Sequence, residues 1–503
     1  MKRILALGLA LLSGAATAIS PLSTQVAEYS VKTYQQDMVD SLAQMVRFKT
    51  VANDEIPFAQ NPEFNGFKAY IRQQAEALGL EYQDHGHVLL VALGQSDKRV
   101  GIVTHGDVQP ADPAKWRKSP FELDMESQPG HLIGRGTEDN KGPIATALYA
   151  MKAIKDKKLV LDRRLELLIY LAEESDWEPF REFLKTYQAP QMNITIDASY
   201  PVVTAEKGWS QIKFLIPQQQ PSAKSALPEL SEFQGGYFAS QIPEDASVVI
   251  SGMSAAELAR LKQAAKQVHP KVKFAFSANG DELKIAAKGV SAHSSSPESG
   301  VNAPVYLAQL LKPFRFAPSP STTTVNFINQ LIGTGFYAEQ FGNLGYRDDF
   351  MGPMTLAPTV IKAVEKGVEV TLNIRRPAGR SAEQMEANAR AALANWSASE
   401  GVKLADISTY WGEPMRVKNA PHANTLLDVF SHYTGMPAKP VSIGGSTNAK
   451  LLPNAVSFGP SMPGVKYTGH SEHEFITLEQ FILNLRMYTA AFVELGQMKS
   501  PSH

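Results

Sequence analysis

Hydrophobic positions in the first part of the chain alternate between two spacings. Residues 26–48 and 67–80 carry apolar side chains at helical intervals, and so does the run 144–155. Short continuous apolar runs typical of buried strands lie at residues 88–93, 100–103, 165–171 and 194–196. This alternation predicts an α/β domain, with a mainly parallel sheet sandwiched by helices.

The pattern changes at about Trp209. Beyond it, short strand-like runs surround the turn Asn279-Gly280, which indicates a hairpin within an α+β module. Residues 360–374 and a helical run at 382–395 look like a second such unit, and the first pattern resumes near Ala405. We therefore predict a domain interrupted by another, with these divisions: 1–18 leader, 19–208 first part, 209–380 insert of two α+β units, 381–503 second part.

The amino terminus is typical of a secretory signal peptide. Lys2 and Arg3 precede an apolar core at residues 4–12, and small residues at 16–18 form a cleavage site. The core is too short to span a bilayer, so we expect it to be removed and the mature protein to be periplasmic or secreted. No membrane attachment is expected after its removal.

Composition narrows the chemistry further. The chain has no Cys, which excludes disulfides, a thiol nucleophile and sulfur ligands for a metal. Lys plus Arg number 49 against 50 Asp plus Glu, so nothing in the charge balance favours nucleic acid or a membrane surface as a partner.

Polar residues gather where a ligand site is expected. In open α/β sheets, ligands bind at the carboxyl ends of the strands. One histidine and five carboxylates follow the strand-like runs or precede a helix: His105, Asp107, Asp139, Glu173, Glu174 and Asp197. A second histidine, His470, lies in a polar loop just before the last helical run.

These residue types suit a metal-dependent hydrolase. A two-metal hydrolase needs a shared carboxylate, His and carboxylate ligands for each metal, and a further carboxylate as base. Taken singly, each candidate has a simpler explanation: a surface turn for His105, a solvated helix face for the glutamate pair, exposed loops for His470 and His293. Their common position after strands or in loops favours the metal centre.

The order of the motifs resembles the M20 family of metallopeptidases, and more narrowly its monomeric bacterial dipeptidases of the PepV type. The motifs are His105-x-Asp107, Gly-Arg-Gly-x-x-Asp139-x-Lys-Gly, Glu173-Glu174, Asp197 and His470-x-x-x-Glu474. Within the insert, Gly289-Val-Ser-Ala-His293 and Asn373-Ile-Arg375 also fit. The resemblance implies a zinc-hydrolase-like catalytic domain with an inserted lid.

The same resemblance implies a role for each residue. Asp139 would bridge two Zn²⁺, with Mn²⁺ or Co²⁺ as other possible metals. His105 and Asp197 would complete one metal, and Glu174 and His470 the other. The remaining roles are Asp107 orienting His105, Glu173 as general base, His293 as donor to the oxyanion, Arg375 as partner of the substrate carboxylate, and Gly444, Gly445 and Ser446 as substrate-binding residues.

Three positions complicate this assignment. Asn140 stands where the dipeptidases often have a second Asp, and His473 is an extra histidine close to His470. Arg376 adjoins Arg375; in an extended segment the two point to opposite faces, so only one reaches the site.

We therefore expect a periplasmic zinc dipeptidase that cleaves small dipeptides with a metal-bound hydroxide. A related alternative is an amidase acting on N-acyl amino acids, and a different class is a non-catalytic binding protein on the same fold. Smaller relatives dimerise through the insert. The longer insert here would let one chain close its own site, so we expect a monomer.

Overall fold

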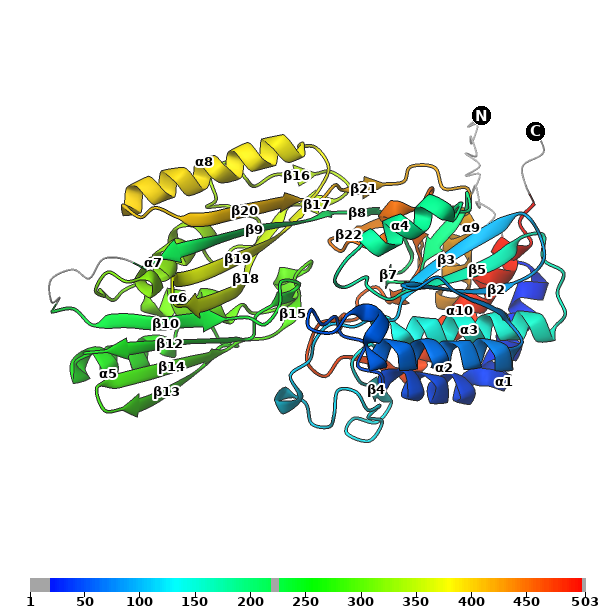
Figure 1. Ribbon diagram of the computed structural model, residues 1–503, viewed down its shortest axis with the longest axis horizontal. Helices are drawn as coiled ribbons and strands as arrows, with labels where there is room; N and C mark the ends of the chain where they lie inside the picture. The colour runs from blue at the N-terminus through cyan, green and yellow to red at the C-terminus, as the bar shows by residue number, and fades with distance from the viewer. Residues whose placement is uncertain (1–18, 219–225, 500–503) are drawn as a thin grey trace, which may run out of the picture.

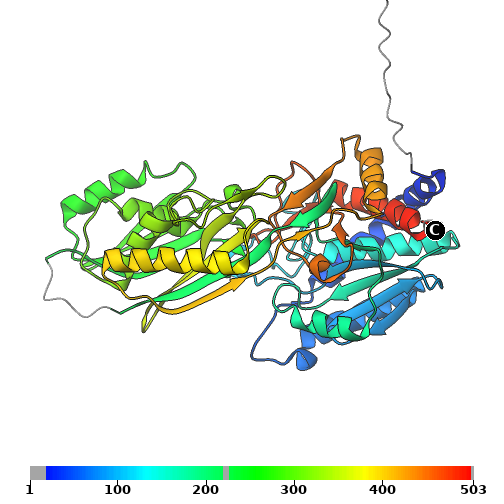
Figure 2. The same ribbon diagram turned by 90° about the horizontal axis from the view of Figure 1, so that it is seen from above.

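The computed structural model describes residues 19–218 and 226–499, and the predicted signal peptide, 1–18, lies outside them. The two ends of the chain together form one lobe, and the middle of the chain forms a second lobe beside it (Figures 1 and 2). No helix in the described part of the chain is both long and apolar enough to cross a membrane.

The first lobe, the catalytic domain, contains a nine-stranded sheet in the order β1-β2-β5-β3-β6-β23-β8-β21, with β22 also paired to β8. The strands are β1 (Glu81–Asp84), β2 (Val88–Leu93), β3 (Arg99–His105), β5 (Arg164–Tyr170), β6 (Asn193–Thr195), β8 (Val202–Glu206), β21 (Met415–Arg416), β22 (Pro440–Ile443) and β23 (Val456–Ser457). The central strands β5-β3-β6-β23 are parallel, while β1, β2 and β21 pair antiparallel at the margins. The predicted parallel pairing thus holds in the centre, which is where the site forms.

Helices cover both faces of this sheet, as the alternating pattern predicts (Figure 1). One face carries α1 (Pro21–Val46), α2 (Pro62–Leu78), α3 (Lys141–Asp156), α9 (Ala423–Thr434) and α10 (Leu478–Gly496). On the other face, α4 (Glu178–Thr186) packs Phe180 and Phe183 against the sheet. Burial of these apolar side chains on both faces fixes the strands whose ends carry the candidate ligands.

The second lobe, the lid, contains an eight-stranded antiparallel sheet in the order β13-β14-β12-β10-β18-β19-β9-β20. Its strands are β9 (Gly208–Pro217), β10 (Glu229–Gly235), β12 (Asp245–Ser251), β13 (Lys273–Asn279), β14 (Glu282–Lys288), β18 (Thr355–Val364), β19 (Gly367–Arg376) and β20 (Ala405–Trp411). Its helices are α5 (Ala255–Ala265), α6 (Ala303–Leu311), α7 (Pro320–Phe327) and α8 (Ala382–Glu400). β10 joins β18 through the pair Gly235–Ile361, so the two predicted α+β units are halves of one sheet.

The predicted end of the insert, at residue 380, is wrong. α8 buries Met385, Leu393 and Trp396 in the core of the lid, and β20 pairs with β9 of the lid sheet. The chain therefore returns to the catalytic domain only after Trp411, with β21. The apolar stripe of α8 predicts a helix but does not say which core it faces.

Candidate active site

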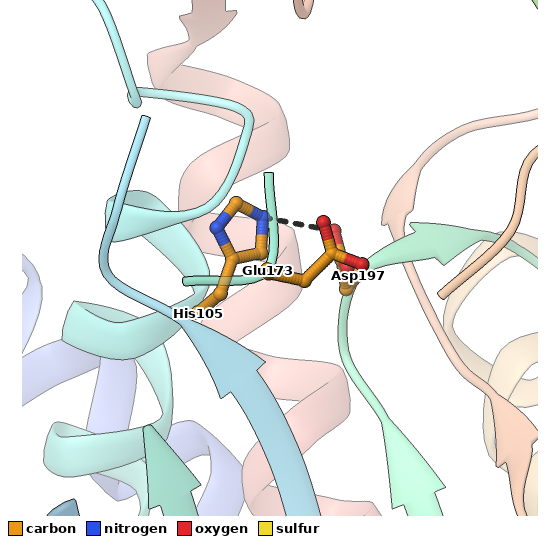
Figure 3. Close-up of side chains that lie close together, drawn as sticks. All are labelled: His105, Glu173 and Asp197. Atoms are coloured by element: carbon orange, nitrogen blue, oxygen red, sulfur yellow. Dashed lines mark ion pairs between the residues drawn. The ribbon is translucent and has the colours of Figure 1, made fainter. Parts of the chain in front are cut away.

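The central parallel strands bring the candidate ligands to one edge of the catalytic sheet. His105 is the last residue of β3, Glu173 and Glu174 follow β5, and Asp197 follows β6. Asp139 precedes α3, and His470 lies in the loop before α10. Figure 3 shows His105, Glu173 and Asp197 pointing toward one another from these elements.

The Asp139 carboxylate lies between two histidine–carboxylate pairs. Its Oδ1 is 2.8 Å from His105 Nε2, and its Oδ2 is 3.2 Å from His470 Nε2. His105 Nε2 is also 3.5 Å from Asp197 Oδ1, while His470 Nε2 is 2.7 Å from Glu174 Oε1. The residues thus divide into two halves that share Asp139, as the family resemblance implies.

The donor set suits divalent cations. His105 belongs to two groups of nearby ligand atoms, one with Glu173 and Asp197 and one with Asp139 and Glu174, and the atoms of each group lie within 4.8 Å of one another. Nitrogen and carboxylate oxygen donors suit Zn²⁺, Mn²⁺ and Co²⁺. Burial alone would lower the pKa of His470, but the carboxylates of Glu174 and Asp139 raise it to about 10. Such a buried negative field favours bound cations.

Asp107 does more than the sequence indicates. His105 Nδ1 lies 2.9 Å from the main-chain carbonyl of Asp107 and 3.5 Å from its carboxylate. The carboxylate instead accepts the backbone N–H groups of Glu173 and Glu174, at 3.0 and 2.9 Å. Asp107 therefore orients His105 mainly through its carbonyl, and its side chain fixes the glutamate pair.

Glu474 explains the spacing of the last motif. Its Oε1 accepts the backbone N–H groups of Glu138 and Asp139, at 2.9 and 3.0 Å, and its Oε2 accepts from Arg135 at 2.8 Å. The carboxylate thereby fixes the loop that carries Asp139. The four-residue separation from His470 was the only signal of this role in the sequence.

Tyr467 and Glu138 contribute to the site but were not predicted from the sequence. The Tyr467 hydroxyl donates to Asp139 Oδ2, and buried Glu138 accepts from the backbone and hydroxyl of Thr468. Burial raises the pKa of Glu138 to about 8. Neither residue lies in a pattern that distinguishes it from ordinary loop positions.

The structure separates the two histidines of the last loop. His473 Nε2 accepts from the backbone N–H of Arg117, and its ring stacks on Trp116, away from Asp139. His470 is therefore the histidine that meets the carboxylates. Asn140, the departure next to Asp139, donates through Nδ2 to Asp197 Oδ1 and so orients that carboxylate.

Glu173 differs from its neighbours. Among the described residues its Oε1 is buried and has no hydrogen-bond partner. Burial and the negative charge of Asp197 raise its pKa well above the usual range. An unpartnered carboxylate oxygen of raised basicity, beside the ligands, is a suitable place for a transferable proton.

A cleft of about 1370 Å³ lies between the two domains and is lined by residues of both. From the lid, His293 on β15 (Ala292–His293) places the centroid of its ring 4.4 Å from the centroid of the His470 ring. The backbone N–H of Ser295 donates to His293 Nδ1, so the neutral ring carries its proton on Nε2. Burial lowers the pKa of His293 well below its usual value, which keeps it neutral.

Arg375 and Arg376 occupy opposite faces of β19. Arg375 lines the cleft, where its guanidinium donates to Ser294 Oγ at 2.9 Å and to Asn373 Oδ1 at 3.1 Å. Arg376 turns to the other face, donating to the Gly412 carbonyl at 2.8 Å and pairing with Glu413 at 2.6 Å. Arg375 is thus the one that a ligand in the cleft would meet.

The loop Gly444–Ser446 also lines the cleft. It is anchored by Thr447, whose N–H and hydroxyl donate to the buried carboxylate of Glu206, at 2.8 and 2.7 Å. Gly444 lies against the lid, because a Cβ there would be 2.3 Å from the Ser295 carbonyl. The loop is therefore a point of contact between the domains as well as part of the cleft wall.

Comparison with known proteins points in one direction. The profile described as "Peptidase family M20/M25/M40" matches residues 101–494. A Beta-Ala-Xaa dipeptidase of Lactobacillus delbrueckii subsp. lactis is 29% identical over 409 residues, which is 80% of this chain and 83% of the relative. The putative dipeptidase YtjP of Bacillus subtilis is 27% identical and aligns over 93% of this chain and 99% of its own.

Solved structures share the fold. Human carnosine dipeptidase 1 superimposes with a TM-score of 0.61 at 16% identity, covering 95% of this chain and all of the other. The di-peptidase Dug1p of Saccharomyces cerevisiae gives 0.59 at 15% identity, covering 95% and 99%. At these identities the likeness concerns the two-domain architecture alone.

Proposed function

The chain belongs to peptidase family M20/M25/M40, and on this premise we propose that it is a periplasmic, zinc-dependent dipeptidase. One observation carries the proposal: Asp139 lies between two histidine–carboxylate pairs, and beside them Glu173 has a buried oxygen with no hydrogen-bond partner in the described part of the chain. The names of the similar dipeptidases support the same substrate class.

Two cations held by the five ligands would polarise the scissile carbonyl and lower the pKa of a water molecule. Glu173 would accept the proton of that attacking water at its free Oε1, and would then deliver it to the leaving amine. Burial and the charge of Asp197 raise its pKa, while the bound cations would favour its ionised form, in which it can accept a proton. The Asp107 carboxylate fixes the backbone from which Glu173 extends, and so holds this base in place.

His293 would stabilise the oxyanion that develops on the substrate carbonyl. Its Nε2–H is free to donate, because Ser295 occupies Nδ1. A neutral donor aimed at the developing charge stabilises the transition state more than the ground state.

Arg375 would bind the free carboxylate of the substrate through its guanidinium. Burial lowers its pKa to about 9, so the side chain remains charged near neutral pH. The neighbouring Gly444–Ser446 loop would contribute main-chain groups to the same end of the cleft.

We also propose a monomer of the periplasm or the extracellular space. His293 reaches His470 of the same chain, which supports a site completed without a second copy. The signal-like residues 1–18 support export.

The test is a panel of dipeptides and N-acyl amino acids, assayed with purified protein before and after chelation and after restoring Zn²⁺. We expect metal-restorable cleavage of dipeptides. Cleavage of the N-acyl amino acids alone would support an amidase. If neither substrate class is hydrolysed in a metal-restorable way, the proposal that the protein is a hydrolase is rejected.

A further inference from the structure

His470 belongs to the catalytic domain, but the lid supplies much of what surrounds it. Gln241 Nε2 donates to the His470 main-chain carbonyl at 2.7 Å, and the Ser240 carbonyl lies 3.4 Å from His470 Nδ1. The rings of Phe238 and His293, both of the lid, lie 5.9 and 4.4 Å from its ring. The Gln241 side chain is buried at this contact, with 3% of its surface exposed.

These lid residues are joined by strand pairing. β11 (Gln241–Ile242) pairs antiparallel with β15, and Gln241 lies directly opposite His293. A lid movement that carries His293 to the site therefore also carries Gln241 and Ser240 to His470.

The backbone of His470 needs such support. Its φ is 63°, a left-handed conformation that is unfavourable for a residue other than glycine. Such a conformation persists where the surroundings hold it. Gln241 holds the carbonyl, and the Ser240 carbonyl favours a proton on Nδ1, which leaves the Nε2 lone pair free for a metal.

The orientation of His105, the histidine of the other half, does not depend on these contacts from the lid. It ends β3, and its Nδ1 lies 2.9 Å from the carbonyl of Asp107, two residues away in the catalytic domain. The two halves of the centre are therefore built differently: one within a single domain, the other across the junction of two.

We propose that the lid positions His470 through Gln241 and the main chain of Ser240, so that cation binding by the His470–Glu174 half is coupled to the seating of the lid. The His105–Asp197 half binds its cation independently of the lid. This inference rests on the metal centre of the proposed function. Because coupling between two equilibria is reciprocal, a cation in the His470 half stabilises the seated lid by the same free energy.

The test is calorimetric titration of Zn²⁺ into chelator-stripped protein, with Gln241→Met as the variant. Methionine keeps the length of the side chain and removes the donor. We expect two binding events in the wild type, and in Gln241→Met a loss of about 10–100-fold in affinity in one of them, as for other groups that orient a metal ligand. The unchanged event reports that the catalytic domain is folded.

Gln234→Met is the matched control. Gln234 is an exposed residue of β10 in the same domain, so its replacement should leave both events as in the wild type. Two unchanged events in Gln241→Met, equal weakening of both, or a wild type that does not bind two Zn²⁺ would each overturn the proposal.

A second pair of measurements assigns the event and tests reciprocity. In a Glu174→Gln background, which disables the His470 half, adding Gln241→Met should not weaken the remaining event further. Zn²⁺ should also slow hydrogen exchange at residues 238–242 in the wild type as the event assigned to the His470 half saturates, and much less in Gln241→Met. A further loss in the first case, or no slowing in the second, would contradict the coupling.

None of these measurements involves a substrate. Two Zn²⁺ events with the expected Gln241 effect, but no dipeptide hydrolysis, would remove the proposed function and leave the coupling. Dipeptide hydrolysis by the wild type together with unaltered Zn²⁺ affinities in Gln241→Met would reject the coupling and leave the proposed function.

Discussion

Glu173 and Glu174 are adjacent in sequence yet meet different surroundings. Glu174 Oε1 lies 2.7 Å from His470 Nε2, and its Oε2 accepts from Gln109 at 2.9 Å. Glu173 Oε1 is buried and has no hydrogen-bond partner within residues 19–218 and 226–499. Distance alone would let either glutamate bind a metal, so the proposed roles, Glu174 as a ligand and Glu173 as the base, rest on the difference in their hydrogen-bond partners.

Replacement of each glutamate should therefore have a different effect. Glu173→Ala should retain two metals but lose activity by several orders of magnitude, because nothing deprotonates the nucleophile. Glu174→Ala should lose metal. Metal content and kcat measured on both variants decide between the roles, and equal loss of metal in the two would reject the assignment.

His293 gives a second residue-scale prediction. If its Nε2–H meets the oxyanion, His293→Ala should lower kcat about 10²–10³-fold, as does the loss of one oxyanion donor elsewhere. Metal content should stay at the wild-type value, since His293 contacts the His470 ring and is not among the ligands. A normal kcat would leave His293 as a loop residue only.

At the scale of elements, the chain was most predictable where burial is two-sided. β2, β3 and β5 are continuous apolar runs because helices cover both faces of the central sheet, and such runs are visible in the sequence. α7, by contrast, contains Thr322, Thr323 and Thr324, and its burial under the lid sheet follows from tertiary packing. Its sequence shows no comparable stripe.

The site divides in the same way. His105, Glu173 and Asp197 were predictable because each lies at the end of a strand or just after it, and the family motifs identified His470. Gln241 was not, because it acts through a contact across 229 residues of sequence that no local pattern records. Long-range positioning of this kind follows only from the packed structure.

α9 offers a prediction on acid stability. His422, at its start, is buried and its Nε2 lies 2.9 Å from the Asn193 carbonyl of β6. Burial lowers its pKa to about 4, from 6.5. Between these values the unfolded chain binds a proton that the folded chain does not, so the free energy of unfolding falls as pH falls from about 6.5 to about 4.

His422→Gln keeps a donor for Asn193 without titrating, and should flatten this dependence. The difference amounts to roughly 2 kcal/mol between pH 7 and pH 4.5, at about 1.4 kcal/mol per unit of pKa. Urea unfolding of chelator-stripped protein at pH 7 and pH 4.5 measures it. His432→Gln, an exposed position on the same helix, should retain the wild-type slope, and an equal slope in both variants would exclude His422 as the cause.

At the scale of the whole molecule, the cleft is larger than its expected substrate. About 1370 Å³ exceeds the roughly 300–1,000 Å³ of pockets that enclose drug-sized ligands. Volume alone therefore cannot restrict the enzyme to dipeptides. A restriction to dipeptides would therefore come from fixed groups at each end: the candidate metal ligands with Glu173 on one side, and the buried guanidinium of Arg375 on the other.

Arg375 extends from the lid, so a substrate carboxylate bound there joins the two domains. Its binding energy would help hold the lid over the scissile bond, and a substrate without it should lose kcat as well as gain KM. We expect dipeptide amides and tripeptides to be poor substrates of the wild type. A tripeptide places its carboxylate one residue too far from the bond that would be cleaved.

Substitution of the two arginines tests this argument. Arg375→Ala should narrow the gap in kcat/KM between a dipeptide and its amide, because the discriminating charge is gone. Arg376→Ala should preserve that gap even if the loss of its contacts with Gly412 and Glu413 lowers the folded fraction, since a ratio of two substrates on one preparation is independent of enzyme concentration. The measurement is kcat/KM for a dipeptide, its amide and the matching tripeptides on all three proteins. Efficient cleavage of amides or tripeptides by the wild type would instead indicate a broader peptidase or amidase, in which the cleft binds the substrate without recognising its terminal carboxylate.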